Sequence, residues 1–363
     1  MGNLETLLKN SGYNFFFLVV DKFLDISLPQ LPNFQSLSQK NLKIKNSGFL
    51  LSQGNIQNTI KSAPNPAIIP FKPSAKIEKI CQKNSWTLVA NPAKINRLLE
   101  NKIKFFETCN INGLPIVPGI VAEFNQNSFQ KAQEKFGNSL VVQTHFGWAG
   151  NSTHYFDNYE TAKAVIPKNT LAKFSPYLKG YSLLNNCCLT RHGLLQSPPA
   201  LQYTGLPNLT QNPFATVGRQ WPSFAPLEIQ EQIYQITENF SNKILKPLNY
   251  RGFFGLDFIV SDNKVYLLEC NPRLTASFAF YTQIEVNNNL TPLFYYHLAE
   301  FINQDYSIDL KLEQQRFHHQ NIIGSEITQR NSDGLIVKKY HDFKVFSTKT
   351  DPVIINQEIL SKL

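Results

Sequence analysis

The hydrophobic pattern is most regular over residues 252–273, GFFGLDFIVSDNKVYLLECNPR. Two runs, FFGLDFIV and KVYLLEC, are rich in aromatic, aliphatic and β-branched residues, which is the composition of β-strands. The polar residues 261–264 separate the two runs, as a turn would. The pattern therefore predicts a β-hairpin.

Other apolar segments predict an α/β organisation. FFFLVV at 15–20 indicates a buried strand, residues 74–83 a helix, and WTLVA at 86–90 a second strand. Strand, helix and strand in this order are typical of an α/β domain. Residues 227–245 carry apolar side chains at helical spacing, which predicts a core-facing helix.

The predicted hairpin carries four polar residues: Asp257, Glu269, Asn271 and Arg273. Side chains alternate between the two faces of a strand, so Glu269, Asn271 and Arg273 are expected on one face. A three-residue loop at 262–264 would place Asp257 directly opposite Glu269. A two-residue loop would put the two acids on opposite faces, so their pairing requires an odd loop or a bulge.

Two adjacent carboxylates repel each other and favour a cation between them. Carboxylate and amide oxygens are ligands that suit Mg²⁺, whose octahedral shell is often completed by substrate phosphates. Arg273 can bind phosphate or carboxylate in a forked, bidentate manner. The alternative is an edge hairpin whose exposed face happens to be charged.

The order D-x11-E-x-N-x-R resembles the metal-binding hairpin of the ATP-grasp superfamily, which includes biotin carboxylase, carbamoyl-phosphate synthetase and many carboxylate–amine ligases. The resemblance implies that Asp257, Glu269 and Asn271 hold Mg²⁺, with Mn²⁺ as the alternative, against the phosphates of ATP. It also implies that Arg273 steadies the transferred phosphoryl group or the acyl-phosphate.

The resemblance extends over about residues 98–300 and implies an α/β fold with an α+β ATP-grasp module. We expect an N-terminal open α/β domain at 1–97, a small lid subdomain at 98–180, a large subdomain with the metal hairpin at 181–300, and a C-terminal extension at 301–363. The extension either closes the active site or mediates dimerisation, so a homodimer remains open.

Residues upstream of the hairpin match the phosphate-binding part of the family. Lys102, which precedes a Gly-Leu-Pro-x-x-Pro segment, corresponds to a lysine that reaches the nucleotide phosphates. Gly147 and Gly150 follow an apolar strand, and glycines let a backbone approach phosphates closely. The family usually has a second phosphate-binding lysine on that strand, where this chain has the neutral Gln143.

The segment FSPYLKGYS at 174–182 resembles the linker where the family binds adenine and ribose. Family members usually offer acidic residues there, whereas this chain has Ser175 and Ser182. Backbone groups near Tyr177 and Leu178 are expected to hold the adenine. The phosphate and metal end of the site thus matches the family, and the nucleoside end departs from it.

Composition agrees with a cytoplasmic enzyme. The chain has 363 residues, 42% hydrophobic and 17% charged, which is enough for a large core in roughly two or three domains. No apolar run reaches the roughly 18 residues of a membrane span, and the N-terminus lacks a secretory pattern. Five scattered cysteines lack metal-site spacing and are expected to be reduced and mostly buried.

Three functions remain in view. The resemblance implies an ATP- and Mg²⁺-dependent ligase, acting on a small-molecule carboxylate and an amine. The departures at Gln143 and the linker favour, as the alternative, a catalytically degenerate nucleotide-binding sensor or scaffold. The net charge of +9 suggests nucleic-acid binding as the third function, but the basic residues are dispersed along the chain, which disfavours it. Arg219 is expected either to bind a substrate carboxylate or to form an ion pair.

Overall fold

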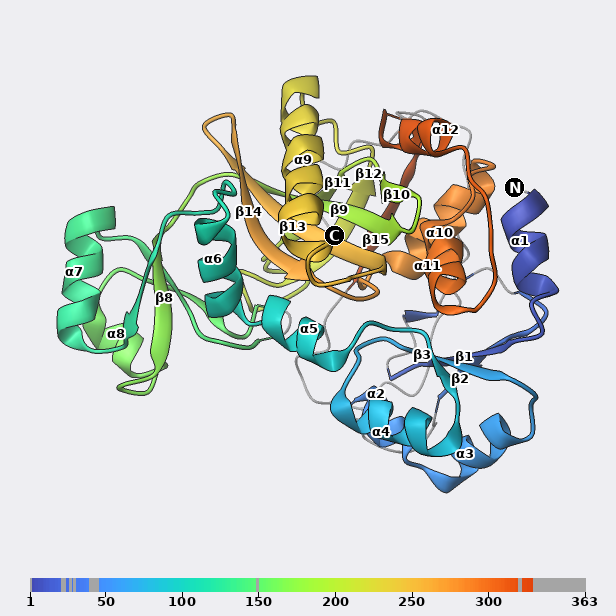
Figure 1. The fold of residues 1–363 in the computed structure, drawn as a ribbon. Helices are drawn as coiled ribbons and strands as arrows, with labels where there is room; N and C mark the ends of the chain where they lie inside the picture. Colours follow the sequence, from blue (N-terminus) through green and yellow to red (C-terminus); the bar gives the residue numbers. More distant parts are fainter. Residues whose placement is uncertain are drawn as a thin grey trace.

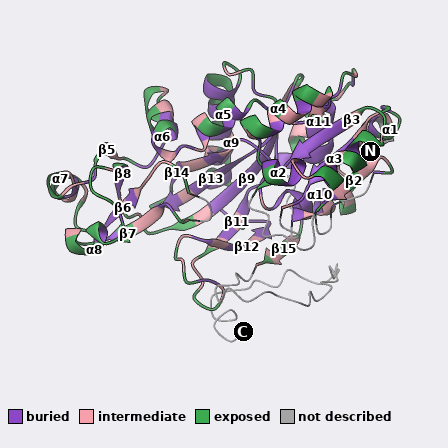
Figure 2. Ribbon diagram, turned by 90° about the horizontal axis from the view of Figure 1, so that it is seen from below, coloured by how far each residue is buried: buried purple, intermediate pink, exposed green. Residues whose placement is uncertain are grey.

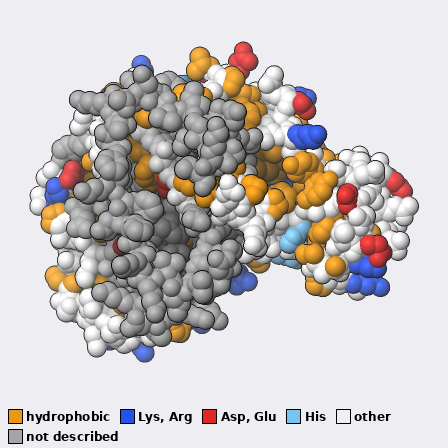
Figure 3. Space-filling view, turned by 180° about the vertical axis from the view of Figure 1, so that it is seen from behind, with side chains coloured by type: hydrophobic (Ala, Val, Ile, Leu, Met, Phe, Trp, Pro, Cys, Tyr) orange, Lys and Arg blue, Asp and Glu red, His pale blue; other side chains and the backbone are white. Residues whose placement is uncertain are grey.

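The computed structural model describes residues 2–20, 24–25, 28, 31–38, 46–147, 150–318 and 322–328. The described strands form three sheets (Figure 1). The N-terminal sheet and the large central sheet lie in one body. The small sheet projects from that body together with its helices, as Figures 1 and 3 both show.

The N-terminal sheet is parallel, with the order β2 (Phe34–Leu37), β1 (Asn14–Leu18), β3 (Pro66–Pro70) and β4 (Thr87–Leu88). Its helices are α1 (Gly2–Lys9), α2 (Ser47–Leu51), α3 (Gly54–Lys61) and α4 (Ala75–Asn84). The side chain of Ser74 caps α4 by accepting a hydrogen bond from the Ile77 backbone. The predicted first strand, helix and second strand of this region are therefore confirmed.

The large sheet is antiparallel, with the order β14 (Lys264–Asn271), β13 (Gly252–Ser261), β9 (Tyr181–Thr190), β11 (Ala200–Thr204), β12 (Thr216–Trp221) and β15 (Gly324–Ile327); β10 (Gly193–Gln196) also pairs with β9. One face packs on α9 (Leu227–Phe240), which continues into the π-helical turn η2 (Ser241–Leu245). The opposite face packs on α10 (Phe278–Asn287) and α11 (Leu293–Phe301). The strands are largely buried between these helices (Figure 2).

The small sheet has the antiparallel order β5 (Ile120–Glu123), β8 (Leu171–Pro176), β6 (Leu140–Gln143) and β7 (Thr153–Phe156). Helices α7 (Gln126–Phe136) and α8 (Tyr159–Lys163) pack on one of its faces and form a core with it. Two helices precede this sheet, α5 (Ala93–Leu99) and α6 (Lys102–Ile111). Helix α6 contacts both β8 and β14, so it bridges the small and large sheets.

The hairpin of β13 and β14 has a two-residue turn, so of the two routes to the pairing of Asp257 with Glu269, an odd loop or a bulge, the structure shows the bulge. Ser261 pairs with Lys264, and both intervening residues, Asp262 and Asn263, have positive φ angles of 49° and 58°. These angles are typical of a type I′ turn, whose twist matches that of the flanking strands. A bulge lies farther along the hairpin, where the register shifts between positions 257 and 258.

The fold class is confirmed as a mixed α/β structure with parallel and antiparallel sheets. The domain boundaries at residues 97, 180 and 300 stay a prediction. Of the expected C-terminal extension, the described residues include α12 (Leu310–Gln314), η3 (Gln315–His318) and β15. The strand-like segments GLIVKKY and FKVFST lie outside the described residues.

All five cysteines are buried and free. Cys187 and Cys188 point into different cores, and Cys270 points away from the hairpin's polar face, as alternation along a strand predicts. Among the helices in the described ranges, none combines the length and apolar character that crossing a membrane requires.

Candidate active site

Asp257 lies opposite Glu269 in the hairpin, as predicted. Its carboxylate accepts hydrogen bonds from Asn271 Nδ2 at 3.0 Å and from Gln202 Nε2, on β11, at 2.7 Å. Burial, followed by the charge of Glu269, raises the pKa of Asp257 to about 7. The two carboxylates therefore repel each other, and a cation bound between them would reduce this repulsion.

Lys102 supplies a counter-charge to Glu269. It is the first residue of α6, which Asn101 caps through hydrogen bonds from the backbones of Ile103 and Lys104. Its Nζ donates to Glu269 Oε2. Burial raises the pKa of Glu269, but Lys102 outweighs it and holds that pKa below its usual range.

Arg273 is 8% exposed and is held by several partners. Its Nε donates to Glu100 Oε1 at 2.6 Å, its Nη2 to Asn271 Oδ1 at 3.0 Å, and its Nη1 to the Leu274 carbonyl at 2.9 Å. Lys72, from the segment after β3, pairs with the same Glu100. The predicted arginine is thus next to the predicted metal ligands, but it is already neutralised by an acid.

These contacts suit an oxygen-donor metal site. Within the described ranges, no group of three or more His, Cys, Asp or Glu side chains could hold a metal ion. The donors brought together are instead two carboxylates and one amide, from Asp257, Glu269 and Asn271. These hard oxygen donors, two of them charged and one neutral, fit Mg²⁺. This ion takes one or two protein carboxylates and keeps positions for water and phosphate.

Gln143 lies at the end of β6 and donates from Nε2 to Thr153 Oγ1 at 3.1 Å. Its Oε1 is 3.5 Å from Nζ of Lys173, a buried lysine on the neighbouring strand β8. The backbone of Lys102 donates to the His145 carbonyl at 2.9 Å, just after β6. The end of β6 and the start of α6 are therefore adjacent.

The loop after β6 needs its glycines for steric reasons. A Cβ on Gly147 would lie 2.1 Å from Ser152 Oγ, and a Cβ on Gly150 would lie 2.9 Å from the backbone of Phe214. Gly150 also has a φ of +81°, which L-residues rarely adopt. The Oγ of Ser152 is buried and has no hydrogen-bond partner among the described residues.

The linker after β8 differs in part from the expectation. The Tyr177 backbone N–H, one group expected near adenine, donates to the Ser139 carbonyl at 3.0 Å. The Tyr177 ring is 44% exposed and lies edge-on to Tyr155. Leu178, the next residue, is partly exposed. The backbone groups of Leu178 and the Tyr177 carbonyl remain the linker atoms proposed for adenine.

Arg219 forms an ion pair, the second of the two expected roles. Its Nη1 lies 2.6 Å from Oε1 of Glu326 on β15, so this strand covers the arginine. Sequence reasoning missed Glu326, Gln202, Glu100 and Lys173. Lys173 and Gln202 had a local signal, since each alternates with apolar or aromatic neighbours along its strand.

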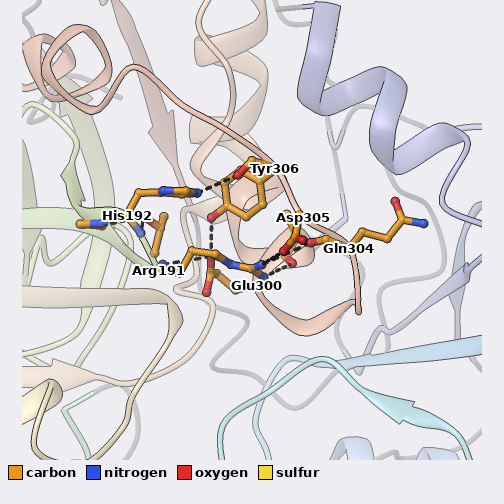
Figure 4. Close-up of polar contacts among 9 residues, drawn as sticks. Arg191, His192, Glu300, Gln304, Asp305 and Tyr306 are labelled. Carbon is orange, nitrogen blue, oxygen red and sulfur yellow. Dashed lines mark hydrogen bonds and ion pairs between the residues drawn. The ribbon is translucent and has the colours of Figure 1, made fainter.

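A cavity of about 800 Å³ lies elsewhere, at the Gly252 end of β13. Figure 4 shows its polar wall, where Arg191 donates to the buried Glu300 and also contacts Asp305. Tyr306 donates to the same Glu300 carboxylate. These satisfied contacts tie the β9–β10 turn to the end of α11.

Comparisons with known proteins agree with this geometry. Residues 99–277 match the family model of the ATP-grasp domain. The arginine-specific carbamoyl phosphate synthase large chain of Halalkalibacterium halodurans is 20% identical over 195 residues, which are 51% of this chain and 17% of that protein. The chain therefore matches only a small part of this curated relative.

Two solved structures share the fold at low identity. N5-carboxyaminoimidazole synthetase from Staphylococcus aureus, complexed with ADP, has a TM-score of 0.56 at 15% identity, covering 81% of this chain and 78% of that one. Biotin carboxylase from Campylobacter jejuni has a TM-score of 0.60 at 12% identity, covering 86% and 70%. Residues 99–277 thus carry an ATP-grasp domain, and the chain shares its fold with these two structures.

Proposed function

We propose that the chain is an ATP- and Mg²⁺-dependent ligase that activates a carboxylate for attack by an amine or a similar nucleophile. The observation that carries this proposal is the direct pairing of Asp257 with Glu269, next to Asn271 and with Lys102 on Glu269. A protein without phosphoryl chemistry has little need for two carboxylates at this position.

In this proposal Asp257, Glu269 and Asn271 hold the Mg²⁺. A bound Mg²⁺ neutralises charge on the phosphate oxygens during phosphoryl transfer. Lys102 leaves Glu269 to contact a phosphate. Arg273, oriented by Glu100, stabilises negative charge that develops next to the hairpin.

The remaining predicted residues position the nucleotide. The loop of Gly147 and Gly150 approaches the phosphates closely, and Gln143 lies at the start of that loop. The linker at Tyr177 and Leu178 holds adenine through backbone groups. The carboxylate substrate receives the γ-phosphoryl group, and the resulting acyl-phosphate loses phosphate when the amine attacks.

Calorimetry of ATP binding with and without Mg²⁺ tests the proposal. We expect Mg²⁺-dependent binding by the wild type, and its loss in Asp257→Asn/Glu269→Gln with the fold retained. Glu134→Gln, on the exposed side of α7, is the matched control and should bind like the wild type. Screening carboxylates and amines for ADP release would then identify the substrates.

Two results would contradict parts of this proposal. Unchanged Mg²⁺-dependent binding in the double variant would remove the metal assignment. Absence of ATP binding by the folded wild type would favour the degenerate scaffold, because Gln143 and the altered linker would then be losses of function.

A further inference from the structure

Lys173 is a buried lysine that pairs with no acid among the described residues. It is 4% exposed, and among the described residues no carboxylate lies within 4.0 Å of its Nζ. Its polar contact is Gln143 Oε1 at 3.5 Å, and its Nζ also lies 4.8 Å from the centre of the Phe106 ring. A neutral amide and an aromatic face compensate a buried charge only in part.

The surroundings of Lys173 disfavour its charged form. Burial, followed by the nearby charge of Lys102, lowers the pKa of Lys173 to about 7, while Cys109 acts weakly in the opposite direction. Lys102 and Cys109 both belong to α6, the helix that packs against β8. Two lysines thus converge on one place, as they do where a protein binds an anion.

The strand register places Lys173 beside Gln143. Gln143 and Lys173 are direct partners in the β6–β8 ladder, and directly opposed residues share a face. The next pair, Val142 and Phe174, points into the core under α7 and α8. Gln143 and Lys173 therefore point to the other face, toward α6 and Lys102.

Ser175 is a second unsatisfied group on that face. It lies two residues after Lys173 on β8, so its side chain points the same way. Ser175 is 2% exposed, and its Oγ has no hydrogen-bond partner among the described residues. A buried hydroxyl and a buried ammonium, both short of partners, indicate a place that a ligand completes.

We propose that Lys173 makes the cationic contact to the nucleotide phosphates that its neutral neighbour across the strands, Gln143, cannot make. This inference rests on the proposed function. Gln143 then acts as a positioning residue, because its Oε1 accepts from Lys173 while its Nε2 is held by Thr153.

Calorimetry with ATP, inorganic tripolyphosphate and adenosine tests the inference. Lys173→Met keeps the stem that packs on Phe106 but removes the charge. We expect about tenfold or greater weakening for ATP and tripolyphosphate, and no change for adenosine. Gln143→Lys/Lys173→Met returns a lysine to the neighbouring strand and should regain most of the lost affinity. Lys131→Met, exposed on α7, is the control.

Proton uptake gives a readout that a merely structural role would not change. At pH 8 with constant Mg²⁺, phosphate binding should protonate Lys173, so the wild type takes up protons, measured in buffers of different ionisation enthalpy. Lys173→Arg should bind ATP without this uptake, because arginine stays charged. This variant also decides the question if Lys173→Met does not fold.

The outcomes separate the two proposals. Failure of the wild type to bind both ATP and tripolyphosphate would overturn the proposed function and this inference with it. Wild-type binding that Lys173→Met fully retains would overturn the role of Lys173 alone. Unchanged proton uptake in Lys173→Arg would do the same.

Discussion

Asp257 faces Glu269 directly because β14 contains one extra residue, Leu268, at a bulge. Before the bulge, Val265 and Leu267 point into the core under α9; after it, Cys270 does. The inward positions thus change from odd to even numbers, and Glu269 turns to the polar face. A regular hairpin with this two-residue turn would have buried Glu269 in the core.

Mg²⁺ binding should strengthen as the pH rises through about 7. Burial and the charge of Glu269 raise the pKa of Asp257 to about 7, and only the ionised carboxylate binds a cation well. Calorimetric titration of Mg²⁺ between pH 6 and 8 measures the effect. Asp257→Asn should remove this pH dependence; a pH-independent affinity in the wild type would contradict the assignment.

Lys102→Met should change the affinity for ATP and the affinity for Mg²⁺ in opposite directions. Loss of the ammonium should weaken ATP binding about tenfold or more, because a charge-assisted contact disappears. Mg²⁺ added without nucleotide should bind more tightly, since Lys102 no longer competes for Glu269. Calorimetry measures both, and Lys104→Met, exposed on the same helix, should change neither.

Glu100→Gln should destabilise the protein at neutral pH by about 3–5 kcal/mol, because it leaves the buried Arg273 without its acid. Burial raises the pKa of Glu100, but Arg273 and Lys72 outweigh it and lower that pKa below 4.5. The stabilisation is therefore present above pH 4.5 and is lost as the pH falls below it.

Urea unfolding at pH 7 and pH 3.5 checks this prediction. The variant should differ most from the wild type at pH 7 and less at pH 3.5. Glu107→Gln, exposed on α6, serves as the control. Equal stability of Glu100→Gln and wild type at pH 7 would show that Arg273 does not depend on Glu100.

Arg316→Met should cost about 3–5 kcal/mol of unfolding free energy. Arg316 and Glu285 are 1% and 0% exposed in their side chains, with Nη1 2.9 Å from Oε1, and the pair fastens η3 to α10. The double variant Arg316→Met/Glu285→Leu should recover part of the loss, because the fully buried Glu285 carboxylate is removed with the arginine, while Glu313, 20% exposed, still loses its partner. Denaturant unfolding measures both, with Lys311→Met as the exposed control.

The sequence predicted those parts of the site that lie close together along the chain. Asp257, Glu269, Asn271 and Arg273 sit on one hairpin, and alternation along a strand determines which of them share a face. The sequence left open whether an odd loop or a bulge pairs the two acids; the structure shows the bulge, and the pairing is confirmed. A two-residue turn and a bulge together give the same pairing as an odd loop.

Residues from other sheets could not be predicted in the same way. Gln202 reaches Asp257 from β11, and Glu100 reaches Arg273 from the end of α5. These contacts depend on how β11 and α5 pack against the hairpin, and no local sequence pattern predicts that packing.

The sequence by itself determined the strands, the core-facing helix and the polar order of the hairpin, because these follow from periodicity and short-range spacing. The tertiary structure decided the charge balance of the site. Only the pairing of β6 with β8 brings Lys173 to Gln143, and only the packing of the folded chain buries that lysine with no acid beside it among the described residues. Long-range strand pairing and desolvation act between distant parts of the chain, so they become visible only once the chain is folded.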